Sequence, residues 1–399
     1  MDILTPIHPT GKLHPAFQKL ITARTFRSAR QQLIECAKRY DDQDGNFVEQ
    51  FQSTGFDART FELFTNELLF SEDFKHVGKH AYPDFHVEKH GIKLAIECTT
   101  SNPTNTGKDQ LKAYEPVNSK DKDIDSLVER LMGDAPIRLA GPLFSKLNKR
   151  FRGTPYWDLP SVKGHPFILA IETFHEDGSL AFSASIIASY LFGIQQTPEW
   201  DNDGKLIIKT HDVEEHKRDK KIIPSGFFDL PDAENISAVL WTNAGTIPKF
   251  ARMGMAGKYP DKGISALRFG NKYDPDPNAH APKPFLHFVG GKKAPKETWG
   301  LESVLFHNPR AKIPVPQGLF ESVTESIIEG GQHVDLIKTE FTPIFSMTMF
   351  TDGENHRAKA LMAGKKIIWP MLNATNEIQN MRDDNPLWDR IRRKLSGQN

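Results

Sequence analysis

The chain has 399 residues, a formal net charge of zero, and the apolar and charged fractions of an ordinary soluble protein. Its two cysteines, Cys36 and Cys98, argue against a disulfide framework, and neither belongs to a paired zinc-ligand motif. No leader sequence and no apolar run long enough to span a bilayer is present, which predicts a cytoplasmic protein without membrane contact.

The first 56 residues are predicted to be a helical N-terminal region. Phe26 to Tyr40 carries Ala29, Leu33 and Ala37 at helical spacing, and the polar run from Asp41 to Gly45 ends the pattern.

A second helix is predicted from Ala58 to Phe70, with Asp57 as its N-cap. It carries Glu62 and Glu67. Glu62 stands between two apolar residues that would pack, so it is the better candidate to reach inward, toward Asp84. The alternative is that both glutamates are solvated, as single helix glutamates commonly are.

Two strands joined by a tight turn are predicted next. Phe85 to Glu88 and Ile92 to Thr99 flank a polar turn that contains Gly91. Side chains alternate across a strand, so Glu97 and Thr99 share one face, and the pairing places Asp84 near Glu97. Two carboxylates this close need a cation between them, or one must hold a proton. Mg²⁺ meets the first condition, because it binds through one or two carboxylates and a substrate phosphate.

The chain then has a polar stretch from Asn102 to Asp125, interpreted as a loop over the site. A basic helix is predicted from Leu143 to Phe151, a buried strand from Pro166 to Ile171, and a packed helix from Phe182 to Leu191. These elements complete a predicted core, residues 57–194.

The order of these elements, with Pro83-Asp84 and Glu97-Cys98-Thr99, resembles the PD-(D/E)xK, or restriction-endonuclease-like, superfamily. The resemblance implies an α/β (α+β) fold with a mixed sheet flanked by helices. It also implies that Asp84 and Glu97, with Glu62 as a further ligand, bind Mg²⁺ or Mn²⁺.

The family's lysine position is taken by Thr99, which has no charge. In this superfamily the lysine is sometimes supplied by the following helix, which makes Lys146, and after it Lys149, the catalytic candidates. The alternative is that these lysines, with Arg150 and Arg152, form a solvated or phosphate-binding face.

Residues 195–399 are predicted to be a mostly β elaboration, with strand-like runs at Leu206 to Ile208, Ile236 to Trp241 and Phe285 to Val289. From Lys249 to Lys296 there are ten basic residues and three acids. Such a patch attracts phosphate backbones. The expected nucleic-acid-binding residues are Lys249, Arg252, Lys258, Lys292 and Lys293. The alternative is a plain solvated face.

The resulting hypothesis is a Mg²⁺-dependent endodeoxyribonuclease that acts on DNA rather than RNA, either alone or as a homodimer. Two alternatives remain open. One is a catalytically inactive nuclease fold that binds nucleic acid, for which Thr99 is the best evidence. The other is a structural or interaction protein in which the acids are ordinary strand residues.

Overall fold

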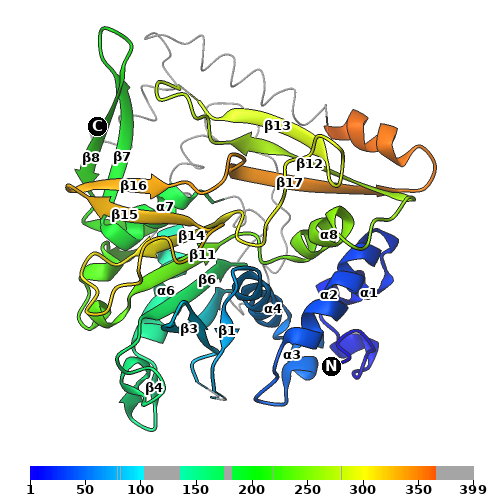
Figure 1. Ribbon diagram of the computed structural model, residues 1–399, viewed down its shortest axis with the longest axis horizontal. Coiled ribbons are helices and arrows are strands. Elements are labelled where there is room, and N and C mark those ends of the chain that lie inside the picture. The colour runs from blue at the N-terminus through cyan, green and yellow to red at the C-terminus, as the bar shows by residue number, and fades with distance from the viewer. Residues whose placement is uncertain are drawn as a thin grey trace.

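The computed structural model describes residues 1–78, 80, 82–102, 135–174, 182–218, 220–279 and 281–364. It is a mixed α/β structure in which one large sheet is covered by helices on both faces, and smaller sheets lie at its sides (Figure 1).

The large sheet has eight strands in the order β1-β2-β3-β6-β11-β14-β15-β16. β3 pairs in parallel with β6, β6 with β11, and β14 with β15, and the other neighbours are antiparallel. The strands are β1 (Lys75–His76), β2 (Phe85–Lys89), β3 (Ile92–Ser101), β6 (Phe167–Thr173), β11 (Ala238–Thr242), β14 (Ser303–His307), β15 (Thr324–Glu329) and β16 (Gln332–Leu336).

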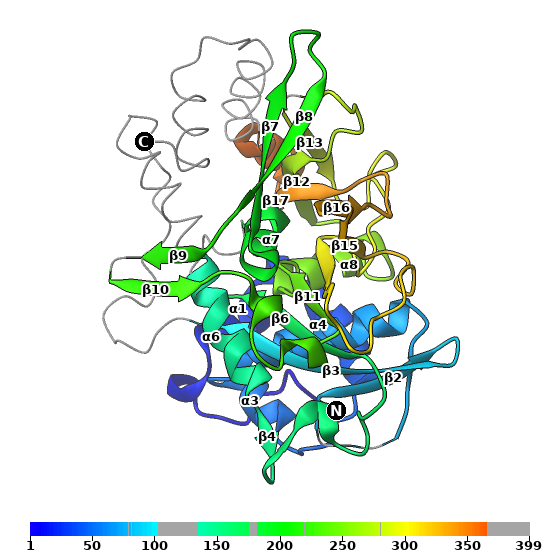
Figure 2. The same ribbon diagram turned by 90° about the vertical axis from the view of Figure 1, so that its left-hand side faces the viewer.

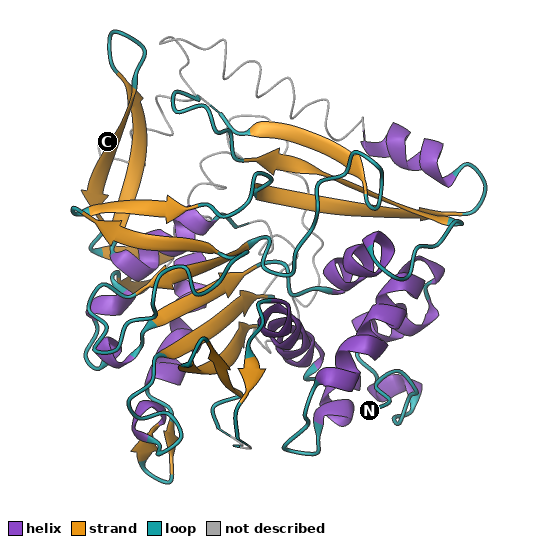
Figure 3. Ribbon diagram, in the orientation of Figure 1, coloured by secondary structure: helices purple, strands orange, loops and turns teal. Residues whose placement is uncertain are grey.

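Helices cover both faces of this sheet (Figure 3). The central strands have apolar residues on both faces, as buried parallel strands do. On β6, Ile168 and Ala170 point toward the N-terminal helices, whereas Leu169 and Ile171 point toward α6 and α7. The helices are α1 (Pro15–Thr22), α2 (Arg27–Arg39), α3 (Phe47–Gln52), α4 (Phe56–Ser71), α6 (Ala135–Leu147) and α7 (Ala184–Phe192).

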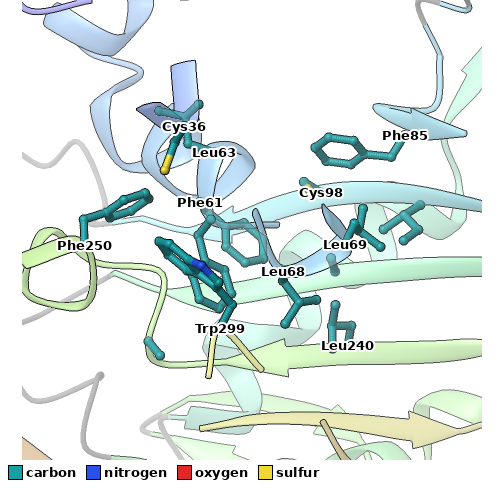
Figure 4. Close-up of a cluster of buried hydrophobic side chains, with 14 of the residues drawn as sticks. Cys36, Phe61, Leu63, Leu68, Leu69, Phe85, Cys98, Leu240, Phe250 and Trp299 are labelled. Atoms are coloured by element: carbon teal, nitrogen blue, oxygen red, sulfur yellow. The ribbon is translucent and has the colours of Figure 1, made fainter. Parts of the chain in front are cut away.

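The N-terminal region packs into the same core as the sheet. Figure 4 shows Cys36 of α2 and Phe61 of α4 in one cluster with Cys98 of β3 and Leu240 of β11. Trp299 closes this cluster on the side of α8 (Ile247–Ala256), where its ring lies 5.3 Å from that of Phe250. The first 56 residues therefore belong to the body of the molecule.

A three-stranded sheet and several hairpins complete the fold. The three-stranded sheet is reached through α8, which packs against α2. A Cβ atom at Gly254 of α8 would lie 2.6 Å from the main-chain oxygen of Ser28, so only glycine permits this close approach. The long β7–β8 hairpin and the β9–β10 hairpin project from the body (Figure 2). These strands are β4 (Arg150–Phe151), β5 (Thr154–Pro155), β7 (Ile194–Trp200), β8 (Leu206–Asp212), β9 (Glu215–Arg218), β10 (Lys221–Pro224), β12 (Ile264–Lys272), β13 (Lys283–Phe288) and β17 (Pro343–Asp352).

The predicted β2–β3 hairpin is confirmed, with His90 and Gly91 at the turn. The predicted basic helix is wrong at its C-terminal end, because α6 stops at Leu147 and Arg150–Phe151 is a strand. The reason is the turn at Arg152 and Gly153, whose positive φ angles fold the chain back into a hairpin. Asp57 lies in the first turn of α4, whose N-cap is Gly55.

The eight-stranded sheet crosses the expected boundary between residues 194 and 195. β11 and β14, from the C-terminal part of the chain, continue the sheet directly from β6. The stretch predicted as a loop, residues 102–125, lies outside the described residues except for Asn102. Within the described ranges, no helix has the length and apolarity that a membrane crossing requires.

Candidate active site

The β2–β3 hairpin brings Asp84 and Glu97 together. Phe85 pairs with Ile96, so Asp84, one residue earlier, lies at the level of Glu97 on the neighbouring strand. The Asp84 carboxylate is fixed there by the main-chain N–H of Cys98, which donates to its Oδ2 at 2.7 Å. Because Ile96 and Cys98 point toward α4, Glu97 points to the opposite face, where α6 lies.

Lys146, in the last turn of α6, supplies a cation to this pair. Its Nζ donates to Oε1 of Glu97 in an ion pair. Glu97 is only 3% exposed, and its second oxygen, Oε2, has no hydrogen-bond partner among the described residues. A buried carboxylate oxygen without a partner costs free energy, and it is free to ligate a metal ion or to accept a hydrogen bond from a water.

The electrostatics of the site favour added positive charge. Burial and the nearby Asp84 raise the pKa of Glu97 from 4.5 to about 7, against the opposing effect of Lys146. Burial also raises the pKa of Asp84, opposed by Lys146 and the Cys98 amide. Burial alone would lower the pKa of Lys146, but the negative charges of Glu97 and Asp84 outweigh the effect of burial, and the pKa is raised. Lys146 therefore stays charged, and one cation serves two carboxylates.

Glu62 lies near the pair but is held by other partners. The Arg59 guanidinium donates to its Oε2 at 2.6 Å and the Tyr40 hydroxyl at 2.9 Å. Burial and then Asp84 raise the pKa of Glu62 to about 7. The side chain thus reaches inward from α4 as expected, and both hydrogen bonds meet its Oε2, where a metal ion would have to compete with Arg59 and Tyr40.

The donor set fits a magnesium ion held by two carboxylates. In the described part of the chain, no three histidine, cysteine, aspartate or glutamate side chains converge as a ready-made metal site. Mg²⁺ does not require three, because it keeps several waters and commonly binds through one or two carboxylates plus phosphate oxygens. Asp84 and Glu97 offer oxygen atoms of this kind, and the unpartnered Oε2 of Glu97 is available without breaking a hydrogen bond.

The structure separates the two lysine candidates. Lys149 is exposed beyond the end of α6 and makes no ion pair within the described residues, whereas Lys146 contacts Glu97. Thr99 is half-buried on the same face of β3 as Glu97. Position 99 of β3 is therefore a neutral side chain, and a lysine from α6 reaches Glu97.

The expected nucleic-acid-binding patch is wrong for two of its five residues. Lys249 is fully buried, and Arg252 is nearly so. Lys249 and Arg252 bind Glu297 at 3.0 and 2.9 Å, so neither can meet a phosphate backbone. The other three lysines, Lys258, Lys292 and Lys293, are exposed.

The sequence reasoning missed three residues around the acids. Arg59 stands one turn before Glu62, an i,i+3 spacing that could have indicated the ion pair. No sequence pattern indicates that Tyr40 lies near Glu62. Tyr156, almost fully buried, lies close enough to Glu97 and Asp84 that these acids, after burial, help to raise the pKa of its phenol.

Another missed residue is Glu172, at the end of β6. It is fully buried, and burial raises its pKa well above the usual value even though the main-chain N–H of Gly245 acts to lower it. Neither of its carboxylate oxygens makes a hydrogen bond of good geometry within the described residues. It points toward α4, on the face opposite to Glu97, and so lies outside the candidate site.

Comparison of the whole chain with protein-family models, with curated proteins and with solved structures found no match.

Proposed function

We propose that this protein is a metal-dependent nuclease that hydrolyses phosphodiester bonds in DNA, with a restriction-endonuclease-like core. The observation that carries the proposal is the ion pair between Lys146 and Glu97 beside Asp84. The two acids come from one hairpin and the lysine from the next described helix along the chain, which is the set of groups that the family resemblance requires.

Each group has a distinct task in this chemistry. Asp84 and Glu97 would hold the metal ion, which when bound lowers the pKa of a coordinated water and stabilises negative charge on the phosphate. Lys146, kept cationic by the acids, donates hydrogen bonds to the attacking water or to a phosphate oxygen. Hydrolysis joins the water oxygen to phosphorus and breaks one P–O ester bond. Burial of the acids excludes bulk water and strengthens these interactions.

The test is cleavage of DNA by the purified protein with Mg²⁺, with Mn²⁺ and with EDTA. We expect metal-dependent cleavage that falls by at least about 100-fold in Asp84→Asn, Glu97→Gln and Lys146→Ala. Lys149→Ala, a lysine close in sequence that does not contact the acids, is the matched control and should cleave like the parent protein. Thermal unfolding of each variant establishes that it is folded.

Two outcomes would contradict the proposal. Cleavage that survives both acid substitutions would assign the activity to a contaminant or another site. Metal-dependent binding of DNA without any cleavage, in a folded parent protein, would support the inactive nucleic-acid-binding alternative.

A further inference from the structure

An exposed aromatic cluster lies beside the candidate active site. It consists of Tyr82, two residues before Asp84, and Phe151, in the β4–β5 hairpin that follows α6 (Figure 1). Their ring centroids are 5.2 Å apart with 35° between the planes. Tyr82 is 39% exposed and Phe151 is 37% exposed. The two rings are in contact with each other, and both are open to water.

Core packing does not account for these two rings. The hairpin region is anchored by Tyr156 and Leu159, which are buried in the cluster between the sheet and α6 and α7. Neither Tyr82 nor Phe151 belongs to a buried cluster. Exposed aromatic groups that the core does not use are a recurrent property of binding surfaces.

The cluster is continuous with the acids. The Tyr82 ring lies 6.0 Å from that of Tyr156, and Tyr156 is near enough to Glu97 and Asp84 to interact with both electrostatically. A nucleotide whose phosphate lies at Asp84 and Glu97 would therefore have the Tyr82 and Phe151 rings within its neighbourhood.

The charge around the cluster is complementary to a phosphate backbone. The guanidinium carbon of Arg152 lies 5.2 Å from the centroid of the Phe151 ring. The guanidinium carbon of Arg150 lies 5.0 Å from the centroid of the Trp157 ring. Arg150 is also 4.0 Å from Asp232, whereas Arg152 makes no ion pair within the described residues. Arg152 is held at the hairpin tip with φ of 51°, a conformation that few residues other than glycine adopt. Such backbone strain recurs at functional sites.

We propose that Tyr82 and Phe151, flanked by Arg152, form a platform that stacks an unpaired base next to the phosphate to be cut. The preferred substrate is then single-stranded nucleic acid or an unpaired end. In a duplex, both faces of each internal base are covered by its neighbours, so only an unpaired base can lie on an aromatic ring. This inference rests on the proposed nuclease function and names its substrate class.

The experiment measures binding in EDTA, where metal-dependent cleavage does not occur. Fluorescence anisotropy would be recorded with labelled oligothymidylate, oligouridylate and a DNA duplex of equal length. We expect the parent protein to prefer the single strands, and Phe151→Leu and Tyr82→Leu to weaken single-strand binding by about tenfold each, as loss of one stacked ring predicts. Duplex binding should change by less than about twofold. The two single-stranded probes show whether DNA or RNA is bound better.

Two controls separate stacking from folding. Phe151→Trp keeps an aromatic face and should bind like the parent protein, and thermal unfolding of Phe151→Leu should match that of the parent, which a purely structural role of Phe151 would not produce. Phe70→Leu changes an exposed phenylalanine on α4, which covers the other face of the sheet, and should bind like the parent protein.

The outcomes distinguish this inference from the proposed function. Cleavage of nucleic acid by the parent protein, with unchanged single-strand binding in Phe151→Leu and Tyr82→Leu, would overturn the platform alone. Stacking-dependent binding without metal-dependent cleavage would support the platform and overturn hydrolysis. A parent protein that binds none of the three probes in EDTA would overturn the platform, whereas the proposed hydrolysis is decided by cleavage with Mg²⁺.

Discussion

Two buried charge clusters in this molecule are built in opposite ways. In the candidate site, Glu97 has one paired cation, Lys146, and Asp84 is influenced by Lys146 and more weakly by Arg59. Between α8 and the three-stranded sheet, two glutamates are surrounded by three cations. That second cluster, the structural ion network, consists of Lys249, Arg252, Arg268, Glu297 and Glu302.

The difference is visible at single oxygen atoms. Glu297 meets Lys249 and Arg252 at one oxygen and Arg252 and Arg268 at the other, all within 3.3 Å. Glu97 has Lys146 at one oxygen and no partner at the other within the described residues. Although burial alone would raise the pKa of Glu297, the surrounding cations lower it far below its usual value. Burial also raises the pKa of Glu97, and there the single lysine Lys146 does not offset it.

The comparison teaches that burial of acids does not mark a functional site by itself. The structural ion network pairs both of its glutamates and holds one cation more than it has acids, so it does not favour a further cation. The candidate site has excess negative charge and an unused oxygen, so an added cation would stabilise it. Functional sites commonly retain such unfavourable arrangements because the ligand relieves them.

The largest expected effect is the loss of an acid from the structural ion network. Glu297→Gln leaves three buried cations with one glutamate, and we expect it to lower the free energy of unfolding by about 3–5 kcal/mol. Urea unfolding followed by circular dichroism measures this. A loss below about 1 kcal/mol would mean that the network contributes little to stability and would break the comparison.

Metal binding should have the next largest effect. If Mg²⁺ binds Asp84 and Glu97 in the folded state only, a concentration of about 100 times Kd adds about 2.7 kcal/mol to the free energy of unfolding. Thermal unfolding with and without Mg²⁺ at pH 8 detects it. The Mg²⁺-induced increase in unfolding temperature should vanish in Glu97→Gln and persist in Glu297→Gln. An equal shift in Glu97→Gln would place the ion elsewhere.

A smaller effect concerns pH without metal. The pKa of Glu97 is raised from 4.5 to about 7 on folding, so the folded state binds more protons between these values. Stability is therefore fully present below about pH 4.5 and is lost as the pH rises toward and through 7. Glu97→Gln removes this loss, and at pH 8 in EDTA it should be more stable than the parent by at least about 1 kcal/mol. Equal or lower stability of the variant would show that the Lys146 ion pair outweighs the burial cost.

The smallest effect separates exposed from buried lysines. Lys292→Ala, at a solvated position, should change the free energy of unfolding by no more than about 0.5 kcal/mol. Lys249→Ala, which leaves Glu297 with one cation fewer, should lower it several times more. The same urea titration compares the two, and similar values for both would contradict the burial of Lys249.

The sequence predicted the part of the site that local patterns determine. Alternation of apolar residues and the glycine turn were sufficient to place Asp84 beside Glu97. The sequence places Lys146 only slightly ahead of Lys149, because the choice between them depends on where α6 ends. Phe151 fits the apolar stripe of a longer helix, and the hairpin turn that takes it out of that helix involves Arg152, a residue that seldom adopts positive φ.

Charge counts along the chain were misleading for a simple physical reason. The basic stretch that predicts a nucleic-acid-binding surface ends at Lys296, one residue before Glu297. The acids that neutralise Lys249 and Arg252 therefore lie just beyond the counted window. Long-range ion pairs of this kind join a helix, a strand and a loop, and no local count can reveal them.

The pairing of β6 on both sides has a consequence for how the protein is made. β6 lies between β3, which carries Glu97, and β11, which is synthesised about seventy residues after it. While the ribosome is still making residues 195–237, β6 has an open edge and the sheet beside the acids is incomplete. The β2–β3 hairpin should therefore reach its final rigidity late in translation, and a chain interrupted at residue 194 would present a buried apolar strand to the cell's chaperones and proteases.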